Sequence, residues 1–233
     1  MVEVAFSEEV KDKAPVSVSV GAPEERVKPL LRGIPDVAAT LVALPAVFFL
    51  VQHARPGIAT IAATVYGICL LLLFSVSATY HTFMWPMHVR LMLRRFDHSM
   101  VYVLIAGCYT PVCLTVLDPG LATPLMVVVW GMTALGIAKS FLWSDAPRWL
   151  NTGVYLLMGW IIVPFSPAVY RGLGYDGFVL LAAGGMAYTL GAIIYARRWP
   201  NPSPRVFGYH ELFHVFVVGA GVCHYMTFWQ LLT

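Results

Sequence analysis

Long apolar runs separated by short polar breaks make up the chain from Pro35 to its end. Each run is roughly twenty residues long, enough to span about 30 Å of hydrocarbon at about 1.5 Å per residue. The seven runs lie near 35–54, 57–83, 98–117, 122–142, 149–168, 176–196 and 208–232. Backbone groups in lipid must form their hydrogen bonds within their own segment, so runs of this length are helices. The pattern predicts an all-α membrane protein with a bundle of seven transmembrane helices.

Polar residues of mixed charge fill the segment before the first run. This segment contains prolines and lacks the basic region and apolar core of a signal peptide. We therefore expect residues 1–34 to form a flexible polar tail on the cytoplasmic side. Residues 35–233 are expected to form one transmembrane domain, without a second, soluble domain.

Lys and Arg residues are distributed unevenly between the two sides of the predicted bundle. Thirteen of them fall in the tail and in the second, fourth and sixth loops, whereas only Arg55 and Arg171 fall on the opposite side. Because cytoplasmic loops carry an excess of Lys and Arg, this count predicts a cytoplasmic N-terminus and a C-terminus outside. An odd number of spans agrees with that orientation.

The composition favours a membrane protein and excludes other classes. Hydrophobic residues make up 59% of the chain and charged residues 12%, about half the charged fraction of a soluble domain. A net charge of +3 without a clustered basic face argues against nucleic-acid binding. The four cysteines stand singly within apolar runs, so we expect buried thiols rather than disulfides or thiolate metal ligands.

Five polar side chains are expected at one depth, near the cytoplasmic ends of the second, third and seventh runs. They are Ser77, His81, Asp97, His210 and His214. Ionisable residues at membrane depth are costly and therefore indicate function. Because a random scatter of histidines would not converge in this way, the convergence is the strongest functional signal in the chain.

The histidines have the spacing of a metal site. His210 and His214 are four residues apart and share a helix face, with Cβ atoms about 6 Å apart, and His81 can supply a third nitrogen. Three imidazoles and a water form the open tetrahedral arrangement of a catalytic zinc ion, and imidazole without thiol favours zinc over copper or calcium. Histidines that only hydrogen-bond to each other would explain the i,i+4 spacing equally well. The presence of His81 and Asp97 at the same depth favours a metal.

Ser77 and Asp97 are the candidate catalytic residues beside this ion. Ser77 precedes His81 by one helical turn and can orient a metal-bound water or donate to an oxyanion, although serine in apolar helices commonly bonds back to the carbonyl four residues earlier. Asp97 can accept a proton from that water or hold it in place, although Asp at a helix start is also a good cap. His98 is turned about 100° away from Asp97 and is excluded from the site.

The seventh run also contains H-E-L-F-H at 210–214, the H-E-x-x-H pattern of zinc proteases in which Glu is the general base. Glu211 stands close to Arg205 at the start of the run, and an interfacial charge explains it adequately. His224 lies too far along the same helix to join the site. We expect it to make a polar helix-packing contact.

Five segments carry a specific resemblance to a known family. They read S-A-T-Y-H at 77–81, R-F-D-H-S-M-V-Y-V-L-I-A-G-C-Y-T-P at 95–111, Y-L-L-M-G-W at 155–160, G-G-M-A-Y-T-L-G-A-I-I-Y-A-R-R at 184–198 and H-E-L-F-H-V-F-V at 210–217. With them the chain resembles the hemolysin III family, the bacterial branch of the progestin and adipoQ receptor superfamily, from Arg32 to the end.

The resemblance implies a seven-helix fold with a cytoplasmic amino end and a zinc ion near the inner leaflet. By the family motifs it assigns zinc ligation to His81, His210 and His214, with Ser77 and Asp97 lining the water position.

The family pattern also bears on Glu211 and Asp36. The residue after the first histidine of the seventh run is not fixed as Glu, which weakens the protease interpretation of Glu211. Asp36 departs from the family because related chains often carry a histidine there, after the Arg-Gly pair. We expect Asp36 to lie away from the metal motifs.

These observations together predict a zinc-dependent hydrolase of a lipid amide or ester, similar to a ceramidase, that acts on a membrane lipid near the cytoplasmic leaflet. The alternative is a non-enzymatic lipid-sensing or membrane-homeostasis protein with a structural zinc. A pore-forming hemolysin and an intramembrane zinc protease rank lower, the former because a fold with most charges in loops and only a compact buried polar site offers no obvious aqueous path. We expect a multi-pass protein of a bacterial inner membrane.

Overall fold

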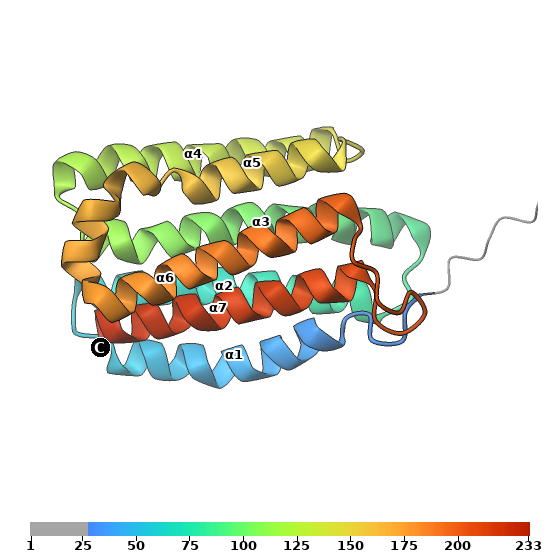
Figure 1. Ribbon diagram of the computed structural model, residues 1–233, viewed down its shortest axis with the longest axis horizontal. Helices are drawn as coiled ribbons and strands as arrows, with labels where there is room; N and C mark the ends of the chain where they lie inside the picture. The colour runs from blue at the N-terminus through green and yellow to red at the C-terminus, as the bar shows by residue number, and fades with distance from the viewer. Residues whose placement is uncertain (1–27) are drawn as a thin grey trace, which may run out of the picture.

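The computed structural model describes residues 28–233, and its long elements are helices (Figure 1). The helices are α1 (Ile34–His53), α2 (Ile58–Thr82), α3 (Met87–Thr115), α4 (Pro119–Leu142), α5 (Arg148–Trp160), α6 (Ser166–Arg197) and α7 (Tyr209–Leu232). A 3₁₀ turn, η1 (Val163–Phe165), joins α5 to α6. Most of the predicted tail, residues 1–27, lies outside the described residues.

The helices form a bundle with their axes close to the long axis of the molecule (Figure 1). Consecutive helices pack together from α1 to α4, and α6 packs along α7, which also contacts α1 and α2. In Figure 1, α4 and α5 form one edge of the bundle and α1 forms the opposite edge. This order places the start of α1, the end of α2 and the start of α7 at the same end of the bundle.

Six stretches of the described chain are long and apolar enough to cross a membrane. One of them, Arg148–Arg197, has 50 residues and contains both the fifth and the sixth predicted runs. A straight helix of that length would extend about 75 Å, more than twice the thickness of the hydrocarbon. The chain instead bends after α5 and returns as α6 beside α7 (Figure 1). The protein is therefore an all-helical, multi-pass integral membrane protein.

The bend differs from the loop predicted between the fifth and sixth runs. The turn residues at 174–177 lie inside α6, where Gly174 has a non-helical φ of 68° and ψ of −175°. Glycine lacks a Cβ and adopts positive φ at little cost. Two helical segments therefore meet at this residue without an intervening loop, which is why the two predicted runs form one stretch.

The start of α3 also differs from the prediction, because the helix begins at Met87 rather than near residue 98. The added turns carry Arg90, Arg94 and Arg95. An apolarity pattern treats such residues as a loop, although a helix can continue beyond the hydrocarbon with long charged side chains whose ends reach polar surroundings. Asp97 consequently lies inside α3, and the explanation of this residue as a helix cap is wrong.

Both the interior and the outer faces of the bundle are apolar. Tyr66, Tyr102 and Phe228 are fully buried, whereas Val127 and Leu135 on α4 are mostly exposed, as a lipid-facing surface requires. All four cysteines are free thiols, and three of them are buried. The burial of Cys69, Cys108 and Cys113 agrees with the prediction of buried thiols, whereas Cys223 is half-buried.

Helices α2 and α3 approach each other closely at Gly107. A Cβ built at this position would lie 2.6 Å from Cβ and 2.8 Å from Sγ of Cys69. Small residues at helix interfaces allow membrane helices to pack closely. The glycine therefore sets the distance between the two helices, and α3 in turn carries Asp97.

We expect Gly107→Ala to destabilise the bundle, because the added methyl group overpacks the α2–α3 interface at a cost of about 1–3 kcal/mol. The matched control is Gly131→Ala in α4, where an added Cβ meets nothing within 4 Å. Thermal unfolding of both variants in detergent measures the difference. Equal melting temperatures for the two variants would contradict a close approach at Gly107.

Candidate metal centre

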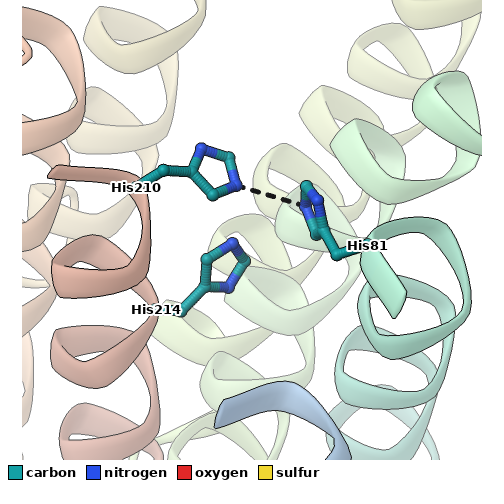
Figure 2. Close-up of side chains that lie close together, drawn as sticks. All are labelled: His81, His210 and His214. Atoms are coloured by element: carbon teal, nitrogen blue, oxygen red, sulfur yellow. Dashed lines mark hydrogen bonds between the residues drawn. The ribbon is translucent and has the colours of Figure 1, made fainter. Parts of the chain in front are cut away.

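Three histidines from two helices meet at one end of the bundle (Figure 2). His81 lies in the last turn of α2, and His210 and His214 lie in the first turns of α7. One ligand nitrogen from each lies within 4.8 Å of those of the other two. His81 and His214 are buried and His210 is half-buried. The predicted convergence of these three side chains is confirmed.

The spacing of the nitrogens fits a tetrahedral ion. Nε2 of His81 and Nε2 of His210 are 3.3 Å apart, and two nitrogens held about 2.05 Å from a tetrahedral zinc ion also lie about 3.3 Å apart. Nε2 of His214 is buried and has no hydrogen-bond partner among the described residues. An unpaired buried acceptor costs free energy, and a metal bound at this nitrogen would remove that cost.

Asp97 and Ser77 lie beside the three histidines. Oδ2 of Asp97 is 3.9 Å from Nε2 of His81. Ser77 is buried one turn before His81. The sequence placed both residues at the site, and their catalytic roles stay predictions.

The expectation that Asp36 lies away from the metal motifs is wrong. Its Oδ1 is 2.8 Å from Nδ1 of His214, and the residue is only 1% exposed. Asp36 belongs to the first turn of α1, which packs against α7. The local sequence could not show this contact, because it depends on how α1 and α7 pack against each other.

Glu211 is neither an interfacial charge near Arg205 nor a general base aimed at the metal position. Its Oε1 pairs with Nε of Arg32, and its Oε2 accepts a hydrogen bond of 2.8 Å from the backbone N–H of Gly208. The residue is 1% exposed and occupies the third position of α7, where a glutamate commonly bonds back to the N-cap backbone. Both carboxylate oxygens are therefore engaged in holding the start of α7.

The residues just before α1 close over the same end of the bundle. The backbone N–H groups of Leu30 and Leu31 donate to the carbonyls of Arg205 and Val206 at 3.1 Å. At Gly33, which has a φ of 88°, a Cβ would lie 3.0 Å from the backbone carbonyl carbon of His81. These contacts fix the start of α1 against the ends of α2 and α7, which positions Asp36.

The other histidines stay outside the cluster, as predicted. The carbonyl of His98 accepts a hydrogen bond from Tyr155, and its side chain is not part of the metal-ligating group. His224 makes helix-packing contacts, with Nδ1 3.4 Å from Sγ of Cys108 and Nε2 3.3 Å from the carbonyl of Leu181.

Comparison with known proteins places the chain among membrane proteins of one family. A family model described as Haemolysin-III related matches residues 25–225. Over 199 residues the chain is 32% identical to Hemolysin-3 of Bacillus cereus (84% of this chain, 86% of that protein). Over 199 residues it is also 34% identical to the Hemolysin-3 homolog of Bacillus subtilis (strain 168) (84% and 88%).

A human protein is similar over a shorter region. The chain is 33% identical over 179 residues to the Monocyte to macrophage differentiation factor of Homo sapiens (74% of this chain, 71% of that protein). The family match covers α1 to α6 and most of α7, including all three histidines. The chain therefore belongs to the Haemolysin-III related family.

Proposed function

We propose that this protein is a zinc-dependent hydrolase of a membrane lipid amide or ester. The observation that carries the proposal is the meeting of three imidazoles from two helices with one carboxylate, Asp97, 3.9 Å from the nearest ligand nitrogen. Three protein ligands leave a coordination position open, which is typical of catalytic rather than structural zinc sites.

Each residue has a definite part in this chemistry. His81, His210 and His214 would hold the ion through their ring nitrogens. A bound zinc ion polarises a carbonyl and lowers the pKa of water. Hydrolysis adds the water oxygen to the acyl carbon and a proton to the leaving amine or alcohol. Asp97 lies where it would take that proton from the water and deliver it, and Ser77, buried one turn before His81, would help to orient the water.

A lipid is the substrate class that suits the surroundings. The site lies at the ends of membrane-spanning helices whose outer faces are apolar. In a bilayer this end of the bundle would lie at about the depth of the lipid carbonyl groups, next to the headgroups. The Lys and Arg count supports seven passes with the N-terminus and this site on the cytoplasmic side. A protease is not favoured, because both oxygens of Glu211 are already engaged.

A second candidate function follows from the position of Asp97, whose Oδ2 lies 3.9 Å from Nε2 of His81. If Asp97 moved to ligate the ion directly, four protein ligands would close the site, as in structural zinc centres. The ion would then tie α2, α3 and α7 together, and the protein would sense the state of the membrane without turnover. The two candidates differ in whether an exchangeable water remains at the ion.

We expect about one zinc ion per chain in protein purified in detergent without chelators. The ion should be lost in His81→Ala, His210→Ala and His214→Ala, because two imidazoles alone bind zinc weakly. His224→Ala is the matched control, since His224 is buried outside the cluster. Mass spectrometry measures the metal content. A folded wild type without zinc, or loss of zinc in the control alone, would contradict the site.

We expect wild-type protein to release fatty acid from at least one lipid in a panel of ceramides, other N-acyl lipids and ester lipids. Asp97→Asn should retain zinc and lose about 10²–10⁴-fold in rate, because it removes a general acid–base. Asp118→Asn, an exposed substitution at the far end of the bundle, should leave the rate unchanged. Chromatographic detection of fatty acid measures the rate.

The outcome also separates the two candidates. Zinc-loaded wild type without release from any lipid would reject the hydrolase and leave the structural-zinc candidate. Equal rates for wild type and Asp97→Asn would reject Asp97 as the group that transfers the proton.

A further inference from the structure

Asp36 touches the candidate metal centre from a helix that contributes none of its three histidines. Its Oδ1 lies 2.8 Å from Nδ1 of His214, and the side chains of both residues are at least nine-tenths buried. The contact is at Nδ1, whereas Nε2 of the same ring has no hydrogen-bond partner in the described part of the chain. Asp36 therefore approaches the site from behind a ligand.

We propose that Asp36 is a positioning residue of the metal centre that holds His214 in its metal-binding tautomer. Its carboxylate accepts the hydrogen bond from Nδ1–H of His214, which leaves the lone pair of Nε2 directed at the ion. Metal-binding histidines commonly donate their second ring nitrogen to a carboxylate, which fixes the ring and makes the ligand nitrogen more basic. The inference rests on the metal site of the proposed function, but not on hydrolysis.

The tautomer follows from the two nitrogens of the ring. A neutral imidazole carries its proton on only one of them. A carboxylate 2.8 Å from Nδ1 places the proton there, because an ionised carboxylate only accepts hydrogen bonds. Nε2 of His214 is then bare and buried, and His214 offers one ring nitrogen within 4.8 Å of those of His81 and His210.

The charge of Asp36 points independently to a cation. Its second oxygen, Oδ2, is buried and has no hydrogen-bond partner among the described residues. Arg32, one turn away along the chain, is paired with Glu211 instead. A buried carboxylate without a compensating charge is costly. A divalent ion at the three histidines, with Asp36 and Asp97 beside it, would make the site electrically neutral.

Asp36 differs from Asp97 in its side of the histidines. Asp97 stands 3.9 Å from Nε2 of His81, a nitrogen of the ligand set, and can reach the reacting atoms. Asp36 faces Nδ1 of His214, so the imidazole ring stands between it and the ion. Its action on the metal is consequently indirect, through the orientation and basicity of His214.

The chain holds Asp36 in this place by several contacts. The Arg32–Glu211 pair and the packing of Gly33 against the end of α2 fix the start of α1. Thr40 then donates its hydroxyl hydrogen to the backbone carbonyl of Asp36 at 2.8 Å. A carboxylate fixed in this way adds α1 to the helices that the metal centre joins.

We expect Asp36→Asn to weaken zinc binding about 10–100-fold, the loss typical when a partner of a metal-ligating histidine is changed. Asp36→Glu should restore part of the affinity, because it keeps the charge, and Asp118→Asn should match wild type. Competition with a chromophoric chelator measures the dissociation constant in each folded variant. The visible spectrum of cobalt-substituted protein should also shift in Asp36→Asn, because the geometry of a ligand changes.

A dissociation constant in Asp36→Asn within twofold of wild type, with an unchanged cobalt spectrum, would overturn the proposal. If the variants fail to fold, wild-type protein labelled with ¹⁵N-histidine decides it. The signal of His214, assigned by its loss in His214→Gln, should show a protonated Nδ1 and a zinc-dependent shift at Nε2. A bare Nδ1, or zinc bound through Nδ1, would overturn the proposal.

The result is separable from that of the hydrolysis assay. Weakened zinc binding in Asp36→Asn together with an inactive wild type would leave the positioning role standing and reject the hydrolase. Unchanged zinc binding in Asp36→Asn together with an active wild type would reject the positioning role and leave the hydrolase standing.

Discussion

The structure depends on the requirement that polar groups buried at the meeting point of α1, α2 and α7 find partners. An unpaired polar or charged group in such surroundings costs far more than one in water. Glu211 meets the requirement with Arg32 and the backbone of Gly208, which fixes the start of α7. Among residues 28–233, the packing leaves two buried atoms at the site without a hydrogen-bond partner, Nε2 of His214 and Oδ2 of Asp36. A bare nitrogen and an uncompensated carboxylate are what a divalent cation would satisfy.

The origin of the site in several helices ties metal binding to the packing of the bundle. His81 comes from α2, His210 and His214 from α7, and Asp36 from α1. Asp97 comes from α3, whose distance from α2 is set in part by the glycine at position 107. Because such a site exists only when the helices are assembled, binding of an ion there would stabilise the assembled state. A change in helix packing would in turn alter the geometry at the ion, which is how a lipid environment would reach the site.

The sequence predicted the part of the site that depends on local periodicity and depth. The i,i+4 pair in α7 and the apolar runs were enough to bring His81, His210 and His214 together. Asp36 was misplaced because its contact with His214 joins residues far apart in the chain, although an acidic residue at the edge of an apolar run was a signal of a buried partner. The start of α3 was missed because Arg90, Arg94 and Arg95 belong to a helix that the apolar pattern ends. Gly174 was taken as part of a loop because a positive φ inside a helix has no sign in the hydrophobic pattern.

Asp97 and Asp36 both bring a carboxylate to the site, and their different positions decide what each carboxylate can do. Oδ2 of Asp97 lies 3.9 Å from Nε2 of His81, farther than the roughly 3.3 Å between two ligands of one tetrahedral ion. The His81–His210 pair meets that spacing, so the distance of Asp97 suits a group that contacts the ion through a water. Asp36 is barred from the ion by the ring of His214 and can act only on that ring. If an ion is bound, a coordination position would therefore stay open on the side of Asp97, while Asp36 would hold His214 on the other side. This asymmetry supports the proposed chemistry at the ion over a purely structural role.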